Sequence, residues 1–214
     1  MLNLKVIVAS IRPGRAADPV VGWIVSRARG DGRFAVDVLD LRDWALPMFA
    51  ETAQTVADPA DPVYSSPKVR RWNRTIADGD AFLFVTPEYN HSVPGALKNA
   101  IDSVYFSFAF RNKPAGAVAY SAGQIGGARA VEHLALIAIE AEMVPLRNAV
   151  LVPAVHDAFS QDGHPINHAM QAAADILLDD LAWWADVLNA ARRRGSLPPA
   201  AARRPAGPPV RAAS

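Results

Sequence analysis

Short apolar runs alternate along this chain with stretches of helical spacing, and this alternation constrains the fold more than any other feature. Four runs are rich in β-branched or aromatic residues and end at turn formers, as buried strands do. They span residues 4–9, 34–39, 81–86 and 116–121, and a weaker fifth run spans 149–153. Between them apolar residues recur every three or four positions, which indicates helices. Strands that alternate with helices form βαβ units, so the pattern predicts a doubly wound α/β fold whose parallel sheet has helices on both faces.

The longest helical pattern lies near the end of the chain. Apolar residues recur there from Ile166 to Leu188, three arginines follow at 192–194, and Gly195 is placed to end the helix. Beyond it Pro, Ala and Arg dominate without apolar periodicity. We therefore expect one domain over residues 1–194 and a disordered tail over residues 195–214.

Composition excludes several classes of function. The net charge of +1 includes three tail arginines that have no acidic neighbour, so the rest of the chain is slightly acidic and offers no footprint for nucleic acid. The absence of cysteine excludes disulfide frameworks, zinc–thiolate sites and thiol nucleophiles. The five histidines lack the spacing of metal ligands. The first apolar run is too short for a signal core or a membrane span, so the expected location is cytoplasmic, away from membranes.

The loop after the first strand has the residues of an anion site. Ser10 offers a hydroxyl, Arg12 and Arg15 offer guanidinium groups, and Gly14 lets the backbone approach a ligand, just before a helix that includes Ala17. Ligands of open α/β sheets bind beyond the carboxyl ends of the strands, where helix N-termini favour negative charge. The loop therefore predicts a site for a phosphate monoester. The alternative is a polar turn with two solvated arginines.

The loop after the third strand lies at the same edge of the expected sheet. It reads Thr86-Pro87-Glu88-Tyr89-Asn90-His91-Ser92-Val93-Pro94-Gly95, and Pro94 near a helix start, with Ser92 as a possible cap, suggests a strand–loop–helix unit. A glycine-rich turn, Ser121-Ala122-Gly123-Gln124-Ile125-Gly126-Gly127, follows the fourth strand. Its glycines would allow the backbone to pass close to a flat ring, although an ordinary strand-to-helix turn explains them equally well.

Together the first two loops resemble the signature of the NADPH-dependent FMN reductases, flavodoxin-like enzymes whose relatives include chromate, quinone and azo-dye reductases. The resemblance extends from residue 4 to about 194. It implies a five-stranded parallel sheet of order 2-1-3-4-5, with the first loop around the FMN phosphate, the second along the ribityl chain and ring, and the glycine-rich turn beside the ring. The implied cofactor-binding residues are Ser10, Arg12, Arg15, Ala17, Pro87, Glu88, Tyr89, Asn90, His91, Ser121, Gly123, Gly126 and Gly127. Glu88 could equally be a structural acid and Tyr89 a packing residue.

The resemblance also implies an activity. Hydride would pass from NADPH or NADH to FMN, and electrons then to a small-molecule acceptor such as a quinone, an azo compound, a metal oxyanion or free flavin. No side chain has to act as acid or base, so no catalytic residue is expected. The alternatives are a flavodoxin-type electron carrier and a non-catalytic FMN-binding redox protein. A homodimer or homotetramer is implied, with either the adjacent Trp183 and Trp184 or the aromatic residues 105–110 covering a partner subunit. Those aromatics could instead border the flavin crevice.

Overall fold

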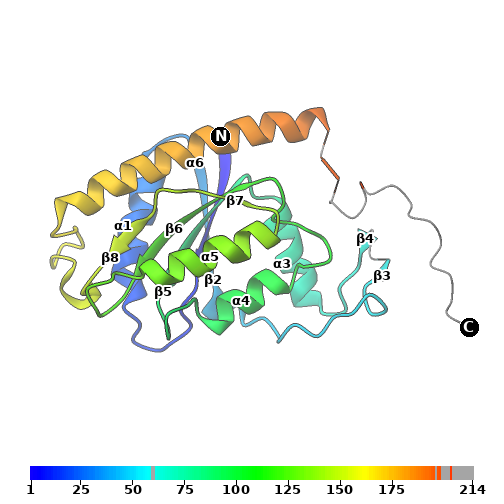
Figure 1. The fold of residues 1–214 in the computed structure, drawn as a ribbon, viewed down its shortest axis with the longest axis horizontal. Helices are drawn as coiled ribbons and strands as arrows, with labels where there is room; N and C mark the ends of the chain where they lie inside the picture. The colour runs from blue at the N-terminus through cyan, green and yellow to red at the C-terminus, as the bar shows by residue number, and fades with distance from the viewer. Residues whose placement is uncertain (59–60, 196, 199–202, 204–214) are drawn as a thin grey trace, which may run out of the picture.

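The computed structural model describes residues 1–58, 61–195, 197–198 and 203, so most of the expected tail lies outside the described residues. A parallel sheet forms the centre of the molecule (Figure 1). Its order is β2-β1-β5-β6-β7, and β8 also pairs with β6. The bounds are β1 Leu2–Val8, β2 Phe34–Asp40, β5 Ala81–Pro87, β6 Pro114–Tyr120, β7 Val144–Pro145 and β8 Val150–Val152. The predicted α/β class and the strand-type runs are confirmed.

The expected count of five strands is wrong by one, because two short strands share the edge beside β6. β7 pairs with the start of β6, where Pro114 is opposite Val144, and β8 pairs with its end, where Tyr120 is opposite Val152. Pro145 has no N–H to donate to the ladder, and the chain leaves the sheet between the two strands. The order 2-1-3-4-5 otherwise holds, with the fifth place divided in two.

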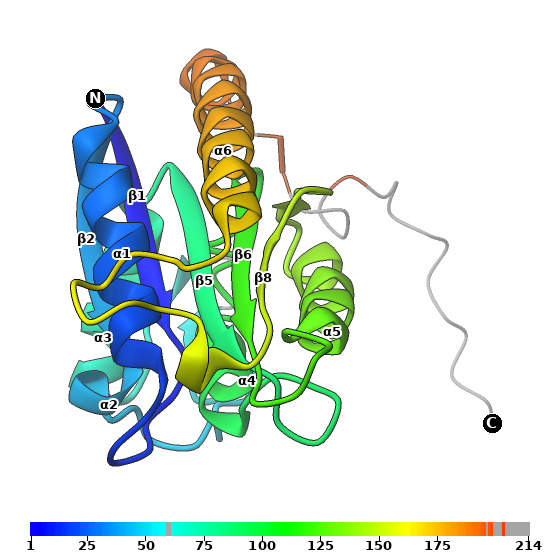
Figure 2. The same ribbon diagram turned by 90° about the vertical axis from the view of Figure 1, so that its left-hand side faces the viewer.

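Helices cover both faces of the sheet (Figure 2). On one face, α1 (Ala17–Gly30) and α6 (His168–Arg194) pack against apolar side chains of β1, β5 and β6. The other face is covered by α3 (Pro67–Ala77), α4 (Gly95–Asp102) and α5 (Ala128–Glu140). Sequence periodicity missed the short helix α2 (Leu41–Trp44), the β3–β4 pair (Ala57–Asp58 and Asp61–Pro62) and a 3₁₀ turn, Val155–Asp157.

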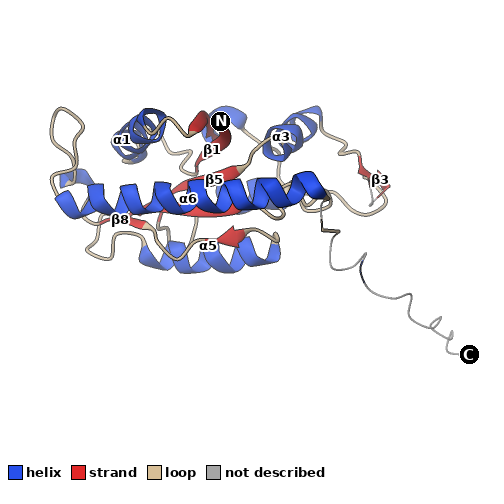
Figure 3. Cartoon of the chain, turned by 90° about the horizontal axis from the view of Figure 1, so that it is seen from above, coloured by secondary structure: helices blue, strands red, loops and turns tan. Residues whose placement is uncertain are grey.

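The last helix has the ends that the sequence predicted. The Asn167 side chain caps its start by accepting a hydrogen bond from the Ala169 N–H, and Gly195 ends it with φ of 140°. Seen from above, α6 runs along the sheet and is the longest element (Figure 3). Within the described residues, no helix is both long and apolar enough to cross a membrane.

Ion pairs and hydrogen bonds join the elements at the amino-terminal edge of the sheet. Lys5 of β1 pairs with Asp37 and Asp78, and Arg192 of α6 pairs with Asp80 at 2.9 Å. The buried Lys113 donates to the backbone carbonyls of residues 76, 77 and 109. Burial, assisted by nearby Arg192, lowers the pKa of Lys113 to about 7, although Asp80 and Asp78 oppose the shift. This edge therefore serves the stability of the fold, and the opposite edge is left for a ligand.

Candidate cofactor site

The loops that follow β1, β5 and β6 meet at the carboxyl edge of the sheet around a pocket of about 270 Å³. This convergence follows from the parallel topology, because neighbouring strands all end at one edge. Of the predicted site residues, those that line the pocket are Ser10, Arg12, Arg15, Pro87, Glu88, Tyr89 and Ser121. Ala122, Tyr120, Val155 and His156 line it as well.

The first loop and the start of α1 form the end of the pocket that suits an anion. Ala17 is the first residue of α1, and the preceding Ala16 provides no side-chain cap, so the N–H groups of the first turn remain available. Arg12 is exposed, and its guanidinium carbon lies over the face of the Tyr89 ring, 5.7 Å from the centroid. The helix N-terminus and this guanidinium together favour a negatively charged group here.

Arg15 has a different role from Arg12. Its guanidinium makes a two-point contact with Asp40, at 2.8 and 2.5 Å, and it also binds Asp18 and the Ser10 carbonyl. The Arg15 side chain is only 5% exposed. Burial alone would raise the pKa of Asp40, but the hydrogen bonds from Arg15 and from the Arg42 backbone N–H, together with the positive charges of both arginines, outweigh it and hold that pKa below its usual value. Arg15 therefore ties the first loop to the end of β2, and its charge is already compensated within the protein.

Tyrosine hydroxyls lie behind the first loop. The Ser10 hydroxyl is 3.0 Å from the Tyr89 hydroxyl, so the first loop contacts the second directly. The Tyr120 hydroxyl is buried and, among the described residues, has no hydrogen-bond partner. Burial raises the pKa of the Tyr120 phenol and nearby Tyr89 adds to the shift, although the neighbouring Ser10 hydroxyl and Arg15 oppose it, so the group remains a neutral donor. Sequence reasoning missed Tyr120, although its position as the last residue of β6 placed it at this edge.

The Glu88 carboxylate is directed toward α5. It accepts hydrogen bonds from the Arg129 backbone N–H, at 3.2 Å, and from the Arg129 guanidinium, at 2.9 Å. Arg129 is the second residue of α5, and the preceding Gly127 has no side chain to cap the helix. Glu88 thus caps α5 from the neighbouring strand. This is the structural role that the sequence left open, and Glu88 reaches the pocket only as part of its wall.

Asn90 and His91 form a tight turn and do not line the pocket. Both have positive φ, 49° and 64°, between Tyr89 and Ser92, which form an antiparallel bridge. Both are exposed. Ser92 does not cap α4, contrary to expectation, because its hydroxyl is 2.9 Å from Nδ1 of His133 and Pro94 occupies the cap position. A flavin contact by Asn90 or His91 stays a prediction.

Two glycines of the third loop, Gly126 and Gly127, have a packing reason that the sequence did not show. A Cβ on Gly127 would lie 2.6 Å from the Ala119 side chain and 2.7 Å from the Tyr120 nitrogen, and a Cβ on Gly126 would lie 2.9 Å from the Pro153 nitrogen. The close approach is therefore to β6 and to the segment after β8. Gly123 is exposed and has free space around it. None of the three lines the pocket, and their contact with a ring stays a prediction.

The aromatic residues after α4 do not line this pocket. Phe110 is buried against Phe82 and Phe84, and Phe106 packs beside Tyr64 in a separate cluster. Tyr105 and Phe108 line a groove of about 280 Å³ between α4 and α5. Of the two alternatives for this segment, the structure therefore disfavours the flavin crevice.

The donors at the pocket suit the phosphate of FMN. A phosphate monoester needs several hydrogen-bond donors and positive charge. The structure provides free helix N–H groups, the Ser10 hydroxyl, the Arg12 guanidinium and a buried phenol without a partner. Among the described residues, no three carboxylate, imidazole or thiol groups come together as a metal site requires. The residues that line the pocket therefore fit a phosphorylated ligand.

The fold and the position of this pocket define a flavodoxin-like protein. Comparison with known proteins makes the class specific, because residues 2–157 match the family model described as NADPH-dependent FMN reductase. An NAD(P)H-dependent FMN reductase of Schizosaccharomyces pombe is 31% identical over 153 residues, which cover 71% of this chain and 74% of that protein. A quinone reductase of Pseudomonas putida is 32% identical over 155 residues, which cover 70% and 77%.

Solved structures agree. The flavoenzyme NAD(P)H:(acceptor) oxidoreductase FerB of Paracoccus denitrificans superposes with a TM-score of 0.70 at 25% identity, covering 87% of this chain and 98% of that one. The chain belongs to the NADPH-dependent FMN reductase family. Family membership confirms the predictions of a flavin-dependent oxidoreductase, with FMN as cofactor and NADPH or NADH as donor.

Proposed function

We propose that this protein uses NADPH or NADH to reduce a small-molecule acceptor, with FMN held at the carboxyl edge of the sheet and its phosphate at the start of α1. One observation carries the proposal: an uncapped helix N-terminus, Arg12 and the hydroxyl groups of Ser10 and Tyr120 converge on one pocket. FMN, when bound, takes up a hydride from the nicotinamide and passes the electrons to the acceptor.

The protein contributes binding and orientation. Ser10, Arg12 and the first turn of α1 would hold the phosphate, while Arg15 keeps the loop in place through Asp40. Pro87, Tyr89 and Ser121 form the wall along which the rest of the cofactor would lie. No side chain has to move a proton in hydride transfer itself, so we propose no catalytic residue.

Quinones are the acceptors that the comparisons favour. Besides the quinone reductase of Pseudomonas putida, a 2-hydroxy-1,4-benzoquinone reductase of a Burkholderia species is 29% identical over 189 residues, which cover 86% of this chain. A flat aromatic acceptor can stack on the flavin face that the nicotinamide leaves. Azo compounds, metal oxyanions and free flavin stay as further predicted acceptors. We also propose that the protein works as a homo-oligomer.

The test has two parts. The purified protein should show the visible absorption bands of oxidised flavin, or acquire them when FMN is added. NADPH or NADH oxidation should then accelerate when a benzoquinone is supplied. A protein that binds FMN but does not oxidise either nucleotide would be an electron carrier or a sensor. A protein that binds no FMN would refute the site itself.

A further inference from the structure

The segment that follows β8 returns along the carboxyl edge of the sheet toward the start of α1. Ala154, with φ of 43°, turns the chain, and the 3₁₀ turn Val155–Asp157 begins directly after it. Two hydrogen bonds hold this turn to the third loop, from the Ala154 N–H to the Gly123 carbonyl, at 3.2 Å, and from the Val155 N–H to the Ser121 carbonyl, at 3.0 Å. The turn therefore has a fixed place beside the pocket, although β8 is not a neighbour of β1 in the sheet.

Apolar packing fixes the same turn against α1. Val155 is 4% exposed and belongs to the apolar cluster that includes Ala17, the first residue of α1. Further along the segment, the Phe159 ring packs on Trp23 of α1, 5.9 Å between centroids, and the segment crosses α1 in Figure 2. Because Val155 turns into the core, the next side chain is on the outside. That side chain is His156, which is exposed and lines the pocket at the start of α1.

Most charges around this pocket are already compensated within the protein. The ion pairs beside it are Arg15–Asp40, Arg15–Asp18 and Glu88–Arg129. Tyr89 and Tyr120 also line the pocket, and phenols carry no charge near neutral pH. Asp157 lies on the same turn as His156 but does not line the pocket. Arg12 and His156 are therefore the groups of the lining that remain to meet the charge of a ligand.

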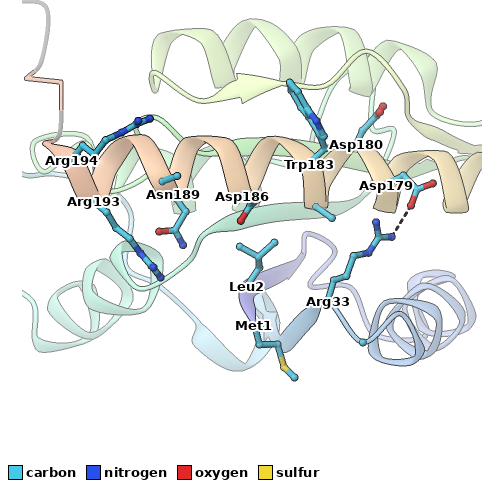
Figure 4. A pocket seen from close by; sticks show the side chains of 13 residues that line it. Met1, Leu2, Arg33, Asp179, Asp180, Trp183, Asp186, Asn189, Arg193 and Arg194 are labelled. Atoms are coloured by element: carbon cyan, nitrogen blue, oxygen red, sulfur yellow. Dashed lines mark hydrogen bonds and ion pairs between the residues drawn. The ribbon is translucent and has the colours of Figure 1, made fainter.

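A larger groove elsewhere offers no such excess of positive charge. It has a volume of about 1160 Å³ and runs along α6 at the opposite edge of the sheet, where β1 begins (Figure 4). Trp183, which is 60% exposed, is part of its wall. The lining contains three aspartates and three arginines, and Asp179 binds Arg33 at 2.7 Å. A phosphate gains little from such a balanced set of charges, so the smaller pocket is the better site for an anionic ligand.

We propose that His156 is a further FMN-binding residue, whose imidazole contacts the phosphate from the turn after β8. The inference rests on the proposed function and adds a contact from a segment outside the three loops. A phosphate favours a charged imidazole, and imidazole is the side chain that ordinarily changes charge between about pH 5 and 8. Arg12 keeps its charge throughout that range. The contribution of His156 to FMN binding should therefore fade as pH rises, whereas that of Arg12 should not.

The test is the dissociation constant of the full chain for FMN, measured by flavin fluorescence at about pH 6.5 and about pH 8.5, on either side of the charge change. His156→Gln keeps an N–H donor but never carries a charge. It should weaken FMN binding about tenfold at the lower pH and less than about threefold at the higher pH. The phosphate itself titrates near pH 6, so wild type and variant are compared at the same pH. Riboflavin, which lacks the phosphate, should bind equally to both proteins.

His164→Gln is the matched control, because His164 is exposed in the same segment and does not line the pocket. Both variants should melt like wild type without FMN, since both side chains are exposed. If His156→Gln binds FMN like wild type at both pH values, the inference is overturned and the proposed function stands. Equal losses for FMN and riboflavin would also overturn it, because they would indicate a role in the shape of the pocket. A wild-type chain that binds no FMN would refute the proposed function as well.

Discussion

Arg12 and Arg15 lie in the same loop and look equivalent in sequence, but the structure predicts different effects when each is replaced by alanine. One replacement should lower the stability of the fold, and the other should lower the affinity for FMN. Arg15→Ala removes the main partner of Asp40, whose side chain is only 15% exposed. Breaking a buried ion pair from one side costs about 3–5 kcal/mol. Asp40 keeps some exposure, the Arg42 backbone N–H as a donor and the Arg42 guanidinium at 3.5 Å, so the low end, about 3 kcal/mol, is expected.

For a chain of this size, that loss corresponds to a fall in melting temperature of about 6–12 °C. Arg12→Ala should leave the melting temperature of the FMN-free protein unchanged. It should instead weaken FMN binding about tenfold to a hundredfold, because it removes one charge-assisted hydrogen bond worth roughly 1.5–3 kcal/mol. Thermal unfolding without FMN and fluorescence titration with FMN measure the two effects separately.

The pH dependence of the Arg15 effect adds an internal check. Arg15 depresses the pKa of Asp40 in the folded state, so its contribution is present above the unfolded pKa of about 3.9 and disappears as pH falls through the folded value. The gap in stability between wild type and Arg15→Ala should therefore close in acid. An Arg15→Ala variant that melts like wild type, yet loses FMN affinity, would show that Arg15 is a ligand contact and that our division is wrong. If neither variant changes the FMN titration, the assignment of the first loop as the phosphate site is wrong.

Four further predictions follow from the site and the core. Tyr120→Phe should weaken FMN about tenfold or more and leave riboflavin binding unchanged, because the buried phenol would donate to the phosphate; equal losses for both ligands would place the hydroxyl elsewhere. Burial lowers the pKa of Lys113 to about 7, so between pH 7 and 10 the unfolded chain binds more protons than the folded protein does. The free energy of unfolding should therefore rise with pH in this range, by up to about 1.4 kcal/mol per pH unit, and Lys113→Met should flatten that slope. Kinetics should be ping-pong, with parallel double-reciprocal plots for nucleotide and quinone, since donor and acceptor would share one flavin face; intersecting lines would require separate sites. Truncation after Gly195 should leave activity and melting temperature unchanged, and a loss of several degrees would mean that the tail packs on the body.

Local patterns in the sequence determined the α/β class and the places where chemistry could occur. Apolar runs located the long strands to within about two residues, because burial on both faces of a parallel sheet demands them. Parallel topology then placed the loops after β1, β5 and β6 at one edge, so Ser10, Arg12 and Tyr89 could be expected around one pocket.

Tertiary structure decided what each of those side chains is free to do. Arg15 meets Asp40 across 25 positions of chain, and Glu88 meets Arg129 across 41, so both charges are compensated by partners that no local pattern specifies. Gly127 is required by the backbone of β6, and the Tyr120 hydroxyl is left unpaired only because of what packs around it. The sequence showed that Trp183 and Trp184 could not both be buried, and the packing of α6 on the sheet exposed both. The sequence thus determined which groups reach the carboxyl edge, whereas long-range pairing determined which of them remain available to a ligand.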